Sequence, residues 1–375
     1  MDNNRNLIIA IVLSIGVLLL WEFFIAQPQI QHQQQQQAIV AGKTATDAGL
    51  VPATAPGTPP ASGAEAPTLT RDQALAGAPR VPIATPSLSG SINLKGGRID
   101  DLRLSKFHEE VDPKSPTIVL LSPSGTPDGY FAEYGWIATA GGPNVPGPDT
   151  LWSAPAGARL TDTTPLTLTY DNGAGLVFTR QIAVDTDYMF TVTDSVANAT
   201  GAPVSLSPYA RVVRQGEPKT AGTWILHEGP IGIFDEGEKE ITYKSLKDTP
   251  ELDFKSSHGW LGFTDKYWAA TLIPANGTAF EARFSRIETP SLFYQADFHE
   301  NPMTVAAGGK AETTNRLFAG AKTVALLSHY RDALSIDRFD NLIYWGKLWF
   351  ITKPMFFLST GCSISSAISA SRSSP

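Results

Sequence analysis

Histidine, cysteine and carboxylate side chains are the groups that most often hold metals or transfer protons, so their spacing is the first test for chemistry. The chain has 375 residues, with six histidines and a single cysteine, Cys362. No histidine lies two or four residues from another; the six are His32, His108, His227, His258, His299 and His329. The spacing therefore predicts no metal site. Patterns of the type G-x-x-x-x-G-K-[ST] and G-x-G-x-x-G are absent too, which excludes the common phosphate-binding loops.

One run of residues, 258–268, concentrates aromatic side chains. It contains two tryptophans and a tyrosine beside an adjacent aspartate and lysine. Tryptophan and tyrosine dominate the energetics of protein interfaces, so the run is a candidate surface for docking a partner. The alternative is a strand and a turn that supply aromatic side chains to a core. The candidate docking residues are Trp260, Asp265, Lys266 and Trp268.

A folded body must position these side chains, and the composition is sufficient to form one. Hydrophobic residues make up 42% of the chain and charged residues 17%, which is enough apolar material for a sizeable core. It is too little for a protein that crosses the membrane many times. The net charge is −7 and no basic patch dominates, so nucleic acid is not an expected partner. One cysteine cannot form an internal disulfide.

An apolar run near the N-terminus predicts the cellular compartment. Residues 7–25 are almost all apolar, and at 1.5 Å per residue a helix of this length roughly matches a ~30 Å hydrocarbon core. No small-x-small cleavage site follows, so we predict an uncleaved anchor over residues 1–26 rather than a signal peptide. Arg5 precedes the run and favours a cytoplasmic N-terminus, with the rest exported. The residues that we assign to the anchor are Leu7, Ile15, Leu20 and Trp21.

Two segments have compositions that are typical of disorder. Residues 27–80 are rich in Gln, Pro and Ala, and residues 358–375 are rich in serine. Neither contains enough apolar side chains to offset the entropy lost on ordering. We expect the first segment to be a linker, acting either as a leash for the following domain or as a passive spacer.

Residues 81–325 show the pattern of an antiparallel β domain. Short runs that alternate apolar and polar residues are separated by Gly, Pro, Asn and Asp, which favours a sandwich or barrel. No alternation with long helical patterns occurs, so an α/β fold is not expected. The clearest strand candidates are 166–170, 188–196, 271–273, 279–287 and 292–298.

Residues 326–357 shift to a helical period. The spacing predicts one helix over 324–333 and a second, amphipathic helix from Asp337 to Pro354, with its aromatic side chains on one stripe. Such a helix can lie in a membrane interface; packing against the β domain is the alternative. The residues that we assign to the interface helix are Phe339, Ile343, Trp349, Phe350 and Lys353.

Five short stretches carry a family resemblance when they are taken in order. They are residues 2–21, G-G-R-I-D-D-L at 96–102, W-L-G-F-T-D-K-Y-W at 260–268, and residues 316–322 and 340–354. Together they resemble the front portion of YidC-type membrane protein insertases, over residues 1–28 and about 80–358. In order, they resemble the family's first transmembrane helix, an early strand and a later segment of its periplasmic domain, the segment before the connecting helices and the helix at the membrane surface.

The resemblance implies a large β-supersandwich domain in the periplasm, similar to that of sugar mutarotases. It implies a non-enzymatic protein of the bacterial inner membrane that needs no cofactor. Such a protein helps to insert and fold inner-membrane proteins, alone or beside the Sec translocon. The expected partners are membrane lipid, nascent inner-membrane proteins and Sec translocon components.

The chain departs from the family pattern after Phe357, where a long apolar helix is expected and a serine-rich stretch is found. The family's core of five further transmembrane helices, with its buried arginine, has no counterpart in these residues. We therefore expect a truncated, single-pass form that does not act as an insertase alone. Two other classes remain open: a structural envelope protein, and a membrane-anchored sugar-binding or mutarotase-like protein. For a mutarotase-like acid/base pair, the hints are His227 with Glu228 or His258.

Overall fold

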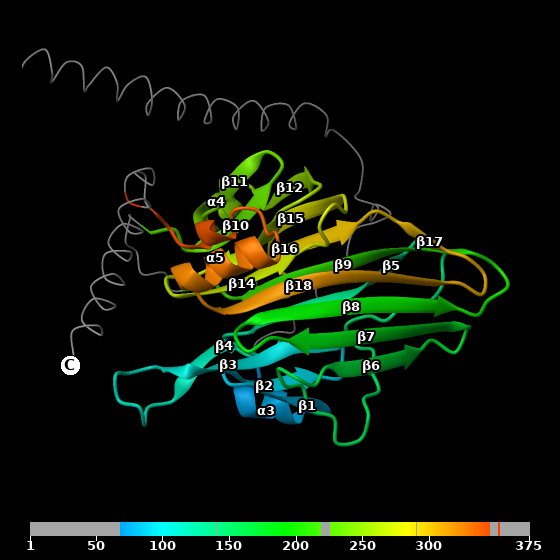
Figure 1. The fold of residues 1–375 in the computed structure, drawn as a ribbon, viewed down its shortest axis with the longest axis horizontal. Helices are drawn as coiled ribbons and strands as arrows, with labels where there is room; N and C mark the ends of the chain where they lie inside the picture. Colours follow the sequence, from blue (N-terminus) through cyan, green and yellow to red (C-terminus); the bar gives the residue numbers. More distant parts are fainter. Residues whose placement is uncertain (1–67, 140, 219–225, 290, 346–351, 353–375) are drawn as a thin grey trace, which may run out of the picture. The chain divides into compact units, whose positions relative to one another are not determined.

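Two antiparallel β-sheets form the body of the protein (Figure 1). The computed structural model describes residues 68–139, 141–218, 226–289, 291–345 and 352. The ten strands of the first sheet are β1 (Arg80–Ala84), β2 (Leu88–Asn93), β3 (Arg98–His108), β4 (Thr117–Leu121), β5 (Tyr130–Ala138), β9 (Val204–Gln215), β12 (Glu251–Ser256), β15 (Phe280–Ile287), β16 (Phe293–Glu300) and β17 (Met303–Val305).

The second sheet has eight strands. Its order is β11-β10-β13-β14-β18-β8-β7-β6, whereas the main path of the first sheet is β1-β2-β3-β5-β9-β16-β15-β12. The strands of the second sheet are β6 (Leu166–Asp171), β7 (Leu176–Val184), β8 (Met189–Asn198), β10 (Gly229–Phe234), β11 (Gly237–Glu240), β13 (Trp260–Thr264), β14 (Trp268–Ile273) and β18 (Lys310–Ala321).

Alternation along the strands builds the core between the sheets. In β8, Phe190, Val192 and Val196 are buried while Thr191 and Thr193 are partly exposed, as the period of two predicts. Aromatic rings join the layers: the Tyr130 and Phe263 centroids are 6.2 Å apart, those of Trp136 and Phe178 6.4 Å, and Phe234 stacks on Phe254 at 4.6 Å. The prediction of a mainly antiparallel β-sandwich is confirmed.

Short helices lie at the edges of this body. Helix α3 (Arg71–Ala76) begins with a capping box made by Thr70 and Gln73, and its Arg71 pairs with Asp101 of β3. It lies within the segment that we interpreted as linker, and six residues are too few to show a helical period. Helix α4 (Tyr243–Asp248) connects β11 to β12 and was not expected either.

Helix α5 (Val324–Ala333) lies across the second sheet (Figure 1), as the spacing predicts. Thr323 caps its first turn by accepting from the Leu326 backbone N–H. Leu327 and Tyr330 are buried, so the apolar stripe packs against the sheet.

The second predicted helix, from Asp337 onward, is wrong over the described residues. A single 3₁₀ turn, η2 (Phe339–Leu342), is followed by extended backbone at Ile343. Phe339 and Leu342 are fully buried, so Phe339 belongs to the core and not to a membrane face. The Phe339 ring packs against Trp260, Phe318 and Tyr330. This packing stabilises the short turn more than further helical hydrogen bonds would stabilise a longer helix. Trp349, Phe350 and Lys353 lie outside the described residues.

The predicted anchor also lies outside the described residues, including Leu7, Ile15, Leu20 and Trp21. Within the part of the chain that the structure describes, every helix is too short or too polar to cross a bilayer.

The edge strands of both sheets carry charged side chains. Strand β11 is an edge strand of the second sheet and contains Glu238, Lys239 and Glu240. Strand β12 ends the first sheet, and its outward residues include Glu251 and Lys255.

Candidate docking surface

Strands β13 and β14 and the turn between them contain the four predicted docking residues. The structure confirms the strand-and-turn alternative for Trp260, which is 0% exposed. Its indole Nε1 donates to the Asp337 backbone oxygen at 2.9 Å, and its ring meets the Phe339 ring edge-to-face at 5.6 Å. Trp260 therefore fastens η2 to the sheet and is not part of a surface.

The other three residues gather at the opposite end of the hairpin. The Asp265 backbone N–H donates to the Trp268 carbonyl at 2.9 Å, which closes a tight turn with Lys266 and Tyr267 at its tip. Tyr267 is 56% exposed, and the Lys266 ammonium lies 4.9 Å from its ring centroid.

Aromatic packing extends the exposed area toward the first sheet. The Trp268 ring contacts Tyr267 at 5.9 Å and Phe107, near the end of β3, at 5.2 Å, both edge-to-face. Phe107 and Trp268 are each partly exposed. We call Phe107, Lys266, Tyr267 and Trp268 the turn surface. Sequence analysis missed Phe107, which no local pattern connects to residues 266–268.

An ion pair between the sheets supports this turn. The Asp265 carboxylate accepts from Arg214 of β9 at 2.7 Å, and Arg214 lies 4.9 Å from the Tyr130 ring centroid. Burial lowers the pKa of Arg214, but Tyr243, Asp265 and Tyr130 outweigh burial and raise it. Arg214 therefore stays charged, and Asp265 holds the turn against the first sheet.

A second cation lies beneath the turn. The Lys322 ammonium donates to the Thr264 hydroxyl at 2.7 Å, and its backbone N–H donates to the Tyr267 carbonyl at 2.9 Å. Burial lowers the pKa of the Lys322 amine from 10.5 to about 8, against the opposing effects of Asp265 and Glu228. Part of this amine is thus neutral in mildly alkaline solution.

The residues that hinted at acid/base catalysis do not converge. The His227 ring nitrogen Nε2 lies 3.0 Å from the Pro230 carbonyl oxygen, and burial lowers its pKa. The Glu228 carboxylate accepts from the Lys266 backbone N–H at 3.1 Å. His258 lies at the other end of the β10–β13 ladder, where its Nδ1 contacts the Asp235 carboxylate at 2.8 Å. Four residue steps along a strand separate the two ends by ~13 Å.

A buried ionic network on the first sheet was not expected from the sequence. The Glu133 carboxylate accepts from Arg98 at 2.7 Å, from the Tyr209 hydroxyl at 3.0 Å and also from Arg211. Burial raises the pKa of Glu133, but Arg211 and Arg98 outweigh burial and hold it below its ordinary value. A carboxylate bound by three donors ties strands together and is not available as a base.

Metal ligation is a further kind of chemistry that clustered side chains could support. Among the residues that the structure describes, no group of three or more His, Cys, Asp or Glu side chains is placed to hold a metal ion.

The arrangement at the β13–β14 turn suits recognition of a partner, because aromatic side chains lie on a turn that an ion pair and hydrogen bonds hold in place.

The chain is similar to membrane protein insertases along nearly all of its length. Residues 80–358 match the family model of the YidC periplasmic domain. A protein of Rhizobium etli (strain CIAT 652), named membrane protein insertase YidC, is 50% identical over 365 residues, which cover 96% of this chain and 61% of that protein. The protein of the same name from Beijerinckia indica subsp. indica is 48% identical and covers 95% of this chain. The chain thus spans about 61% of the length of these relatives.

A match among solved structures is a galactose mutarotase related enzyme from Lactobacillus acidophilus. The TM-score is 0.47 and the sequence identity 8%, with 65% of this chain and 98% of that chain covered.

Proposed function

The chain belongs to the YidC family, and from this premise we propose that it assists the insertion and folding of inner-membrane proteins. The observation that carries the proposal is the agreement of two comparisons: the match to the periplasmic domain over residues 80–358, and 50% identity to an insertase over 365 residues. The relatives are named as membrane protein insertases, which favours this role over a mutarotase-like one.

We place the protein in the bacterial inner membrane with its β domain in the periplasm. The apolar run 7–25 supplies the membrane anchor in this proposal. The name of the matched family supports a periplasmic position for residues 80–358. Ile343 packs against the core, so of the predicted interface residues we retain Trp349, Phe350 and Lys353 as candidates for contact with the lipid surface.

The turn surface is our candidate for contact with nascent inner-membrane proteins or Sec translocon components. Binding a partner through the Tyr267 ring should cost little conformational entropy. The hydrogen bond between Asp265 and Trp268 and the ion pair between Arg214 and Asp265 already hold the backbone of the turn. Lys266 adds a cation beside the ring, which suits acidic and polar parts of a partner.

Site-specific crosslinking tests this role. A photoreactive amino acid is placed at position 267 of the full chain in cells that synthesise a stalled nascent inner-membrane protein. Leu151 is a matched control, because it is an apolar residue of similar exposure, 59%. We expect several-fold more crosslinks to the nascent chain or to Sec components from position 267 than from position 151. Equal yields from the two positions would remove the turn surface from the proposal.

A further inference from the structure

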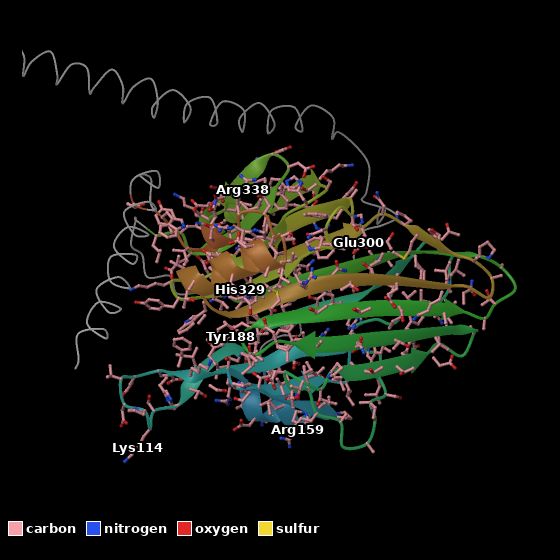
Figure 2. The ribbon with its side chains drawn as sticks, viewed as in Figure 1. Lys114, Arg159, Tyr188, Glu300, His329 and Arg338 are labelled. Carbon is pink, nitrogen blue, oxygen red and sulfur yellow. The ribbon has the colours of Figure 1, made fainter. Side chains whose placement is uncertain are left out.

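A groove runs along the outer face of the second sheet, beside α5. Its volume is about 340 Å³, within the range of small-molecule sites. Strands β7, β8 and β18 form its floor and α5 forms one wall, where Figure 2 labels His329. Apolar side chains line part of it, including Met189 and Leu334.

Strand pairing brings a cation to the floor of this groove. Arg316 of β18 is the cross-strand partner of Thr191 of β8, which in turn pairs with Ala183 of β7. Cross-strand partners point to the same face of a sheet, so all three belong to the face that α5 partly covers. Phe318, two residues along β18, lies beneath α5 with its ring 6.0 Å from that of Tyr330.

Arg316 is partly exposed, and among the described residues its guanidinium forms no hydrogen bond or ion pair, so it is open to a ligand in the groove. Asp185 also lines the groove, but its carboxylate does not pair with Arg316. Asp185 Oδ1 accepts from the backbone N–H groups of Asp187 and Met189 at 2.9 and 3.0 Å, and Oδ2 accepts from the Tyr330 hydroxyl at 2.6 Å. A solvent-accessible guanidinium beside apolar side chains can pair with an anion that also has an apolar part.

We propose that this groove binds a small anion with an apolar body. The carboxylate or phosphate group pairs with Arg316, whose planar guanidinium suits two parallel hydrogen bonds to such a group. The apolar body lies against Met189, Ala333 and Leu334. The same chemistry is offered by a soluble amphiphilic acid and by the headgroup and glycerol region of an anionic phospholipid. The inference is independent of the turn surface.

Ligand binding to the full chain, held in phosphatidylcholine nanodiscs, tests the proposal by saturation-transfer NMR. The probes are 3-phenylpropionate, its neutral amide, and inorganic phosphate. We expect the acid to bind and the amide and phosphate to bind at least tenfold more weakly, because each lacks one half of the recognised structure. Equal binding of acid and amide, or no binding of the acid at millimolar concentration, would overturn the proposal.

Substitutions locate the site. Arg316→Gln should weaken binding of 3-phenylpropionate roughly tenfold or more, since a charge-assisted pair is lost. Arg159→Gln is the matched control: Arg159 is exposed, forms no ion pair among the described residues, and lies far from His329 in Figure 2. Ala333→Trp fills the groove and should abolish binding while leaving Arg316 in place. Unchanged affinity in both groove variants contradicts the proposal.

Competition then identifies the source of the anion. Displacement of 3-phenylpropionate by soluble dihexanoyl phosphatidylglycerol, but not by dihexanoyl phosphatidylcholine, assigns a lipid. Retention of 3-phenylpropionate in the presence of both lipids assigns a soluble acid.

Discussion

The two ends of the β13–β14 hairpin have similar residue types and opposite environments. At the open end Trp260 is 0% exposed, because Phe339 and the Asp337 carbonyl cover it. At the turn end Tyr267 is 56% exposed, on a turn braced by Arg214. The comparison teaches that an aromatic run does not mark a surface by itself. Whether a segment distant in the sequence packs over an aromatic ring decides whether that ring is buried and stabilises the fold, as Trp260 does, or stays exposed, as Tyr267 does.

Truncation at the open end should have the largest effect. Trp260→Ala removes a fully buried ring and the hydrogen bond to Asp337, so we expect a loss of about 3–5 kcal/mol in the free energy of unfolding. Chemical denaturation of the purified chain measures it. Trp268→Ala, at a partly exposed ring, should cost clearly less. Similar losses for the two variants would erase the distinction between the two ends.

The ion pair that braces the turn should come next. Asp265→Asn leaves Arg214 partly buried without its carboxylate, at a cost of about 1–3 kcal/mol in the free energy of unfolding. The control is Asp149→Asn, because Asp149 pairs with Lys95 but its side chain is 84% exposed. That pair should contribute less than about 1 kcal/mol. A thermal unfolding series compares the two, and equal shifts would contradict a bracing role for Asp265.

Lys322 gives the turn end a pH dependence. Burial lowers the pKa of its amine to about 8 in the folded protein, from 10.5. Between these values the unfolded chain binds more protons, so this group raises the free energy of unfolding with pH, by at most ~1.4 kcal/mol per pH unit. Below pH 8 both states are protonated and the group adds no slope. Lys322→Met should remove the slope, measured by denaturation at pH 7.5 to 9.5; an unchanged slope would assign it to other groups.

The smallest effect on stability should follow a change at the exposed ring. Tyr267→Ser should alter the free energy of unfolding by no more than about 0.5 kcal/mol, because the side chain is largely in water. The same change should reduce crosslinking of a partner from a photoreactive group at position 266 several-fold. Crosslinking that survives intact would show that the ring does not contribute to docking.

The five strand candidates of the sequence coincide with β6, β8, β14, β15 and β16, and the spacing also predicts α5, because local period decides these elements. Strand β8 alternates as expected, and α5 spans residues 324–333 as its spacing indicates. The outcome at Phe339 could not be read locally. Residues 339–353 do have helical spacing. However, the Phe339 ring packs against Trp260, which lies 79 residues earlier in the chain, and the helix ends after one turn.

The sequence predicts the turn of the candidate site but not the residues that support it. Its turn follows from the residue types of 265–268, whereas its support does not. Arg214 reaches Asp265 across 51 residues, and Phe107 reaches Trp268 from another sheet. Such contacts depend on strand order, which alternation does not encode.

The charges on β11 and β12 affect how the two sheets meet other extended chains. Among the described residues, each of these strands has a neighbouring strand on one side only. The backbone N–H and C=O groups on its other side form a template onto which another extended chain could add. Glutamate and lysine along these rims make such addition costly for a stray unfolded polypeptide. The charged rims thus keep the two sheets from extending into fibrous aggregates through these edges.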